Sequence, residues 1–339
     1  MSPSLVIGAN GFLGSHVTRQ LVQSGAEVRV MVRPNAKTVG IDHLGVTRFT
    51  GDVFDSDTLR AAMDGCEDVY YCVVDTRAWL RDPAPLFRTN VDGVRNVLDA
   101  AHHVDLKRFV YTSSYVTVGR RSGHLASEDD VLQWKSSDGQ YALSRLQGEQ
   151  LVLRYAHDHG LPAVAMCVST TYGAGDWGMT PQGAMIAGAA YGKVPFVMKG
   201  IVLEVVGVED AARAMILAAE HGRNGERYIV SEKMMTNAEI VRIAAEEGGV
   251  PVPRRSIPVA ALYAMGALGT LKARLRGTDE RLTLSSVRLM RAEAAVDHSK
   301  AVRELGWRPN PVEDSIRAAA RFWVEQRKAR KSAGAAPQT

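Results

Sequence analysis

The first residues that could do chemistry are three glycines near the start of the chain. Gly8, Gly11 and Gly14 recur at intervals of three, directly after a short apolar run. A turn without Cβ atoms lets backbone N–H groups approach a pyrophosphate, and the helix that follows points its positive end at that anion. The pattern therefore predicts a dinucleotide-binding turn. The residues expected to contact the pyrophosphate are Gly8, Asn10, Gly11, Phe12, Leu13 and Gly14.

The end of the second apolar run carries a basic residue where NAD-binding proteins place an acid. That acid binds the 2′-hydroxyl of the adenosine ribose, about 20 residues beyond the glycine turn. Here Arg33 occupies the position, and Lys37 follows four residues later. A guanidinium can hold a 2′-phosphate through paired, charge-assisted hydrogen bonds. The sequence therefore favours NADP(H), with NAD(H) possible and an unpartnered surface arginine as the alternative interpretation.

The cysteines and histidines show neither a metal-site pattern nor a disulfide framework. Cys66, Cys72 and Cys167 form no CxxC pair, and the nine histidines form no HExxH motif. Cys72 and Cys167 lie in apolar runs that we interpret as buried strands, which predicts reduced core thiols. His157 and His159 are two residues apart on an expected helix and so point to different faces. We expect no metal.

The length of the chain predicts one large domain with a smaller lobe, and its charge bears on the kind of partner. The chain has 339 residues and a formal net charge of +4, from 41 basic and 37 acidic residues. This balance argues against a nucleic-acid surface. No signal peptide or membrane-spanning run is visible, so we expect a cytoplasmic location. We also expect a monomer or homodimer that binds a small molecule.

The elements that must position the glycine turn alternate along the first half of the chain. Apolar runs without period-two alternation are typical of strands covered on both faces. Alternation of such runs with amphipathic stretches predicts an α/β protein with a Rossmann-type, doubly wound parallel sheet. The expected strands are Leu5–Gly8, Val28–Val32, Val46–Thr50, Val69–Val74, Phe109–Thr112 and Ala163–Val168. The expected helices are Phe12–Ser24, Ser56–Met63, Leu86–His102 and Gln140–His157.

The alternation ends after Tyr172, where a second lobe is expected to begin. We assign residues 1–172 to the dinucleotide-binding domain and 173–330 mainly to a smaller α/β substrate-binding lobe, with segments that return to the core. Residues 331–339 are expected to form a flexible tail. Later helices are expected over Val208–His221, Thr236–Gly248 and Val312–Arg330. The apolar stretch Val259–Leu271 is expected to be a core helix, with a pocket lining or peripheral membrane contact as alternatives.

A set of short motifs in a fixed order links the chain to a known family. The motifs are GANGFLG (8–14), GDV (51–53), NVDG (90–93), TSS (112–114), YALSR (141–145), STT (169–171), GAGD (173–176), VEDA (208–211) and GERY (225–228). With these motifs the sequence resembles the extended short-chain dehydrogenases/reductases over residues 4–325. Within that family it is most similar to the dihydroflavonol-4-reductase-like and hopanoid-associated sugar-epimerase-like branch.

The resemblance implies further cofactor contacts. They are Asp52 and Val53 at the adenine, Cys72, Val73 and Val74 near the nicotinamide ribose, Asn90, and Val168 near the carboxamide. The family usually has a proline at the position of Val168.

The resemblance also implies the catalytic residues. Ser114 matches the serine that hydrogen-bonds the substrate oxygen, and Tyr141 matches the general acid/base. The unperturbed pKa of tyrosine is near 10, and in the family a lysine four residues later lowers it and binds the ribose. Arg145 stands at that position, on the same helix face as Tyr141. It keeps the charge, but a guanidinium is bulkier and cannot relay a proton.

Three functions are compatible with these residues. The first is an NADP(H)-dependent carbonyl reductase or alcohol dehydrogenase for a hydrophobic ketone or secondary alcohol, which we expect. The second is an NAD-dependent nucleotide-sugar epimerase or dehydratase, which in the family usually has an arginine where Leu203 stands. The third is a non-catalytic NADP(H)-binding module, against which the presence of Ser114 and Tyr141 argues. We assign substrate contacts to the loops Thr76–Pro85 and Gly119–Gln140 and to the late lobe.

Overall fold

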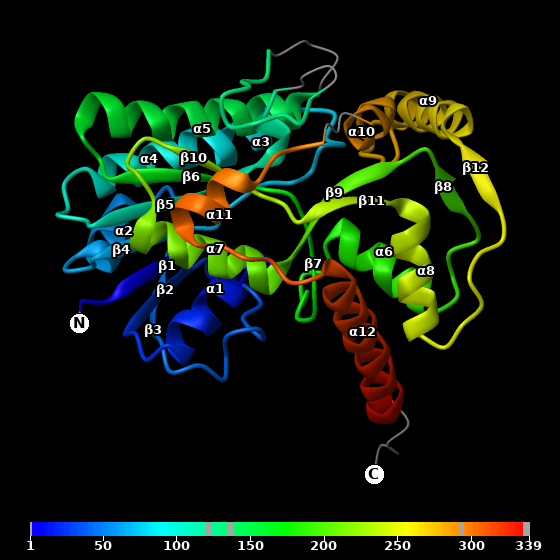
Figure 1. Ribbon diagram of the computed structural model, residues 1–339, viewed down its shortest axis with the longest axis horizontal. Helices are drawn as coiled ribbons and strands as arrows, with labels where there is room; N and C mark the ends of the chain where they lie inside the picture. The colour runs from blue at the N-terminus through cyan, green and yellow to red at the C-terminus, as the bar shows by residue number, and fades with distance from the viewer. Residues whose placement is uncertain (1, 120–123, 134–138, 292–294, 335–339) are drawn as a thin grey trace.

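A parallel sheet with helices on both faces forms the larger part of the molecule (Figure 1). The computed structural model describes residues 2–119, 124–133, 139–291 and 295–334. Within them, seven strands pair in the order β10-β6-β5-β4-β1-β2-β3, and every pair is parallel. The expected doubly wound α/β fold is therefore confirmed. The strands are β1 (Ser4–Ile7), β2 (Val28–Val32), β3 (Thr47–Thr50), β4 (Asp68–Tyr71), β5 (Arg108–Ser114), β6 (Ala163–Val168) and β10 (Arg227–Val230).

Two helical layers bury the faces of this sheet. Helices α1 (Phe12–Gln23), α7 (Val208–His221) and α11 (Ser299–Leu305) cover one face. The other is covered by α2 (Ser56–Met63), α4 (Gly93–Ala101) and α5 (Gln140–His159). Along β1, Val6 packs toward the first layer, whereas Leu5 and Ile7 pack toward the second. Because both faces are covered, the strand is apolar at each of these positions.

Two predicted elements differ from the structure near the site. The expected strand Val69–Val74 ends at Tyr71, so Cys72 lies just beyond β4 and is only partly buried. The expected helix Leu86–His102 is divided into α3 (Ala84–Phe87), a π-helical turn over Arg88–Asp92, and α4. The π-helical turn directs Asn90 into the interior, and such turns are frequent at functional sites.

The second lobe lies beside the carboxyl edge of the large sheet (Figure 1). It contains a three-stranded sheet, β11-β9-β7, and the pair β12-β8. Its strands are β7 (Thr170–Tyr172), β8 (Val197–Lys199), β9 (Val202–Gly207), β11 (Lys233–Thr236) and β12 (Ser256–Pro258). Helices α6 (Pro181–Ala190), α8 (Asn237–Glu247) and α12 (Val312–Gly334) share one hydrophobic core. Helix α12 extends four residues into the segment expected to be a tail, and residues 335–339 lie outside the described part.

The helix that the apolar stretch 259–271 forms is not a core helix. Helix α9 (Val259–Arg276) buries Leu262, Gly266 and Ala273 against α10 (Leu284–Met290) and its surroundings. The side opposite these residues is exposed. The expectation of a core helix was wrong because only Leu262 and small residues form the packed side, whereas Leu268, Leu271 and Leu275 are exposed.

Candidate active site

The glycine turn has a backbone that side chains could not follow. Gly8 follows β1 with φ of +85°, a left-handed conformation that favours glycine. A Cβ on Gly14 would lie 2.3 Å from the carbonyl oxygen of Gly8, so no other residue fits where α1 begins. Gly11 caps α1 without a side-chain hydrogen bond to the first-turn N–H groups. The turn therefore offers those N–H groups and the helix dipole to an anion, and fits a pyrophosphate.

Residues from three neighbouring strands, among them Cys72, lie in a row near the carboxyl end of the sheet. Ile7, Tyr71 and Tyr111 are register partners in β1, β4 and β5, so Gly8, Cys72 and Thr112 stand one step beyond them. The strand order reverses between β1 and β4, which is where doubly wound sheets bind their ligands.

Cys72 has no role as a nucleophile in this row. The Thr112 hydroxyl lies 3.6 Å from the Cys72 sulfur. Burial raises the pKa of the Cys72 thiol to about 12. A thiol with a raised pKa is a poor nucleophile, so the Cys72 side chain is expected to pack rather than to attack a substrate.

The end of β2 presents basic side chains to solvent. Arg33 and Lys37 are both exposed, and within the described residues no ion pair to Arg33 is found. Asp75, which is nearly buried, lies within the electrostatic reach of Arg33. Burial alone would raise the pKa of Asp75, but hydrogen bonds from Arg77 and the charge of Arg33 hold it below its ordinary value. Among these residues the basic side chains of Arg33, Lys37 and Arg77 therefore outnumber the one acid, Asp75.

The residues that the resemblance assigns to the cofactor divide into exposed and enclosed ones. Asp52 is partly exposed and accepts a hydrogen bond from the Phe54 N–H at 3.2 Å. Val53 is buried and packs against Gly93, while Val73 is partly exposed. Val168 is buried at the end of β6, where it is the register partner of Ser114.

Asn90 is fully enclosed, and its amide bonds three groups within the chain. Its Oδ1 accepts a hydrogen bond from the N–H of Asp75 at 2.9 Å. Its Nδ2 donates to the carbonyl oxygen of Asp75 and to the hydroxyl of Ser144, each at 3.0 Å. Asn90 thus joins the segment after β4 to α5, and in this structure it braces the site.

The expected catalytic residues come from β5 and from the first turns of α5, which pack together. Ser114 is the last residue of β5 and is buried, with its hydroxyl 3.4 Å from the N–H of Val116. Tyr141 is the second residue of α5 and is partly exposed. Arg145 follows one helical turn later, and its guanidinium lies within electrostatic range of Tyr141.

Arg145 is enclosed rather than displayed on the surface. Its side chain is 1% exposed, and its guanidinium lies 5.4 Å from the centre of the Tyr111 ring. Nη2 donates a hydrogen bond to the carbonyl oxygen of Thr112. Nε and Nη1 are buried and have no hydrogen-bond partner among the described residues. Buried donors without partners are costly and rare, so these two fit a bound group such as the ribose hydroxyls of a dinucleotide.

A buried ionic network behind Ser114 was not predicted from the sequence. Glu149 of α5 accepts hydrogen bonds from the hydroxyls of Ser113 and Thr117, the latter at 2.8 Å. Its other oxygen lies 3.0 Å from Nε of Arg227, a residue of β10. The Thr117 hydroxyl oxygen also lies 2.7 Å from the carbonyl oxygen of Ser114, so its single proton is positioned between the two acceptors. The network therefore fixes the segment that carries Ser114, and the GERY motif was the only sequence signal for its arginine.

The loops expected to contact the substrate are described only in part. The loop Thr76–Pro85 lies within the described residues and follows β4. Of the loop Gly119–Gln140, residues 120–123 and 134–138 lie outside the described part. The assignment of substrate contacts to these loops therefore stays a prediction.

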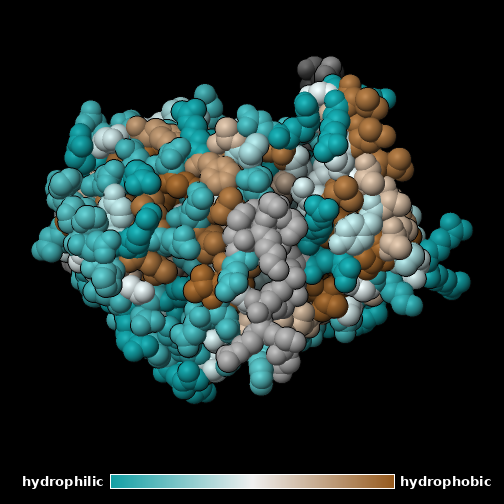
Figure 2. All heavy atoms as spheres, turned by 90° about the horizontal axis from the view of Figure 1, so that it is seen from above, coloured by the Kyte–Doolittle hydropathy of each residue, from teal (hydrophilic) through white to brown (hydrophobic). Residues whose placement is uncertain are grey.

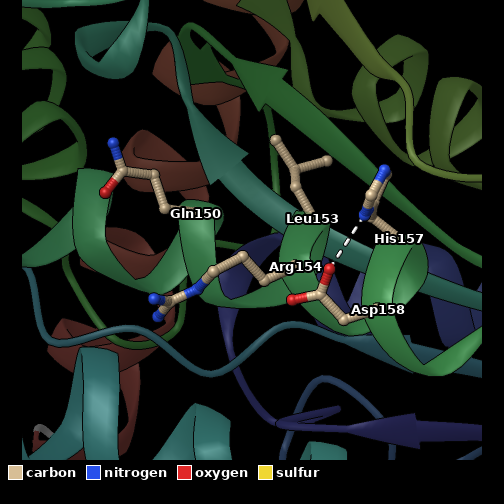
Figure 3. A pocket seen from close by; sticks show the side chains of 5 residues that line it. All are labelled: Gln150, Leu153, Arg154, His157 and Asp158. Atoms are coloured by element: carbon tan, nitrogen blue, oxygen red, sulfur yellow. Dashed lines mark hydrogen bonds and ion pairs between the residues drawn. The ribbon is translucent and has the colours of Figure 1, made fainter.

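The hollow shown in Figure 3 is lined by none of the expected catalytic or cofactor-binding residues. Gln150, Leu153, Arg154, His157 and Asp158 line it, all from one side of α5. His157 and Asp158 form an exposed pair at 2.8 Å. In the described part of the chain, no group of three or more His, Cys, Asp or Glu residues is arranged to hold a metal.

Comparisons with known proteins match most of the chain. A family model described as "NAD dependent epimerase/dehydratase family" matches residues 4–231. The chain is 28% identical over 326 residues to a "putative dihydroflavonol 4-reductase" of Synechocystis, covering 94% of both proteins. It is 28% identical to "sterol demethylase protein B" of Methylococcus capsulatus, covering 96% of this chain and 98% of that protein. The crystal structure of gox2253 matches with a TM-score of 0.83 at 32% identity, covering 96% of this chain and 99% of that one.

Proposed function

Because the chain belongs to the NAD dependent epimerase/dehydratase family, we propose that it is an NADP(H)-dependent oxidoreductase that interconverts a ketone and a secondary alcohol. The proposed substrate is a hydrophobic small molecule. The observation that carries the choice of cofactor is Arg33, which is exposed at the end of β2 where an NAD-specific protein would have an acid. The names of the reductase-like relative and of the sterol demethylase relative support an apolar substrate.

The proposed chemistry assigns one task to each polar group of the site. When bound, the nicotinamide would supply or accept the hydride at the carbonyl carbon. Tyr141 gives a proton to the oxygen that becomes negative, or removes it in the reverse direction. Ser114 donates a hydrogen bond to the same oxygen and stabilises the developing charge. Arg145 holds the ribose through Nε and Nη1, and its positive charge lies within electrostatic range of Tyr141.

The second lobe argues against a nucleotide-sugar substrate. Leu203 lies on β9, where the family's sugar-nucleotide enzymes usually have an arginine to grip the diphosphate. Its partly buried side chain packs with the apolar residues that join α6 and α8 to α9. An apolar side chain offers no donor to a diphosphate, so we favour the oxidoreductase over the epimerase or dehydratase.

A fluorescence titration with both dinucleotides tests the cofactor assignment. The wild-type chain should bind NADPH more tightly than NADH. Arg33→Asp should reverse the order, because it removes the donor for the 2′-phosphate and supplies an acceptor for the 2′-hydroxyl. Arg48→Asp, which changes an exposed arginine of β3 paired with Asp42, is the matched control and should keep the wild-type preference. Equal affinity of the wild type for both dinucleotides would refute the assignment.

A further inference from the structure

Helix α9 carries an apolar face that the described part of the chain leaves uncovered. Leu268, Leu271 and Leu275 are three and four residues apart and therefore share one side of the helix. They are 67%, 53% and 78% exposed, and Leu275 and Leu268 are the two most exposed large apolar side chains in the described residues. Figure 2 shows apolar side chains gathered at this end of the molecule, over α9.

The packing of α9 explains why its leucines face outward. A Cβ on Gly269 would lie 1.9 Å from the carbonyl oxygen of Leu282, and one on Gly266 would lie 3.0 Å from that of Thr283. The glycine side of α9 is therefore the side that can approach α10 so closely. Alanines 260, 264 and 267 extend the leucine side and are also exposed. We call this side, with Leu268, Leu271 and Leu275, the α9 apolar face.

Basic residues are concentrated in the segment that carries the α9 apolar face. Between residues 250 and 291 there are eight arginines or lysines against two acids, a formal excess of six positive charges. The whole chain has a net charge of only +4, so the rest of it is slightly acidic. All eight are exposed, and they are Arg254, Arg255, Lys272, Arg274, Arg276, Arg281, Arg288 and Arg291. Within the described residues, only Lys272 of this group has an acidic partner close by, Glu280 at 2.6 Å.

We propose that the α9 apolar face, with the exposed arginines around it, docks the protein on the surface of a membrane that contains anionic lipids. Apolar side chains flanked by cations are the pattern of a surface that rests in the headgroup region. A second copy of the chain is a poorer occupant, since a symmetric contact would bring the basic residues of both copies together. Among the described helices none is long and apolar enough to cross a bilayer, so the contact lies on the membrane surface.

The α9 apolar face is adjacent to loops at the carboxyl end of the large sheet. The segment after α9 contacts the loop that follows β4, where the N–H of Arg81 donates to Asp279 at 3.0 Å. The guanidinium of Arg281 lies 5.7 Å from the centre of the Trp79 ring. A protein held on a membrane by α9 would therefore bring this loop near the lipid surface.

Sedimentation of the full chain with lipid vesicles tests the proposal. The wild type should bind vesicles of equimolar phosphatidylcholine and phosphatidylglycerol, bind phosphatidylcholine alone much more weakly, and dissociate as salt increases. Leu268→Gln/Leu271→Gln/Leu275→Gln should weaken binding at least about tenfold by removing the apolar contact. Arg274→Gln/Arg276→Gln should weaken it roughly thirtyfold, at about fivefold for each basic residue near an anionic surface.

Matched controls place the same changes elsewhere on the surface. Arg95→Gln/Arg154→Gln alters two exposed arginines of α4 and α5, and Val39→Gln alters an apolar side chain that is 48% exposed between β2 and β3. Both should bind the mixed vesicles like the wild type. Absence of wild-type binding, or unchanged binding of both α9 variants, would overturn the proposal. It would also be overturned if light scattering showed a dimer that the leucine variant abolishes, because the face would then be a subunit interface.

Discussion

Replacement of Arg145 by methionine separates a cofactor contact from a structural role. In the protein without cofactor, Nε and Nη1 of Arg145 are buried without partners among the described residues. Each such donor costs about 1–3 kcal/mol. The Arg145→Met substitution would remove that cost, but it would also remove the hydrogen bond to Thr112 and the contact with the Tyr111 ring. Those two are worth together about 2–5 kcal/mol. The two donors together cost about 4 kcal/mol at the middle of their range, and the lost contacts are worth about 3.5 kcal/mol at the middle of theirs. Because these values nearly cancel, the free energy of unfolding without cofactor should change by less than about 2 kcal/mol.

Cofactor binding should respond much more strongly than stability. Loss of two donors to the ribose should weaken NADPH binding by about 2–4 kcal/mol, or roughly 30- to 1,000-fold in Kd. Urea unfolding measures the first quantity and fluorescence titration the second. Arg154→Met, which changes an exposed arginine on the outer side of the same helix, is the control and should change neither. A large loss of stability with unchanged NADPH affinity would show that Arg145 only braces β5, and would refute the assignment.

Two further predictions concern the first helix. Gly14→Ala should abolish NADPH binding, because its Cβ would lie 2.3 Å from the carbonyl oxygen of Gly8. Gly25→Ala, beyond α1, has open space around it but φ of +82°, so it should lower stability and leave NADPH binding unchanged. Fluorescence titration and thermal unfolding distinguish the two variants, and NADPH binding by Gly14→Ala would contradict the geometry. His16 is buried with Nε2 at 3.0 Å from the Ala174 oxygen, and burial lowers its pKa to about 4 from an ordinary 6.5. As the pH falls, His16 is protonated in the unfolded chain before it is protonated in the folded chain. The contribution of neutral His16 to the free energy of unfolding should therefore be fully present above pH 6.5, and that free energy should fall by up to about 3 kcal/mol toward pH 4. His16→Gln should lack this part of the pH dependence, and identical profiles would refute it.

The family and the central sheet could be predicted because their signals are local. Continuous apolar runs and the glycine turn predicted β2, α2 and β6 at their observed bounds, and the motif order predicted the family. The π-helical turn at Arg88–Asp92 could not be predicted, since it depends on bonds that Asn90 makes with residues 15 and 54 positions away. The Glu149–Arg227 pair likewise joins α5 to a strand 78 positions later.

The exposure of α9 could not be predicted for a different reason. Hydrophobic periodicity shows that leucines share a side of the helix, and burial is then the usual inference. In α9 the close approach to α10 requires glycine at positions 266 and 269, so the leucines face away from the protein. Which side of a helix packs is decided by the shape of its neighbour, and the neighbour is not visible in the local pattern.

The central claim, that Tyr141 protonates a ketone reduced by NADPH, is tested most directly by turnover. Purified wild-type chain should oxidise NADPH in the presence of at least one member of a panel of hydrophobic ketones, and more slowly with NADH. Tyr141→Phe should bind NADPH with nearly wild-type affinity and lose at least about 100-fold in kcat, because a proton donor is lost without a change of shape. A Tyr141→Phe variant that keeps most of the wild-type kcat on the same ketone would contradict the account.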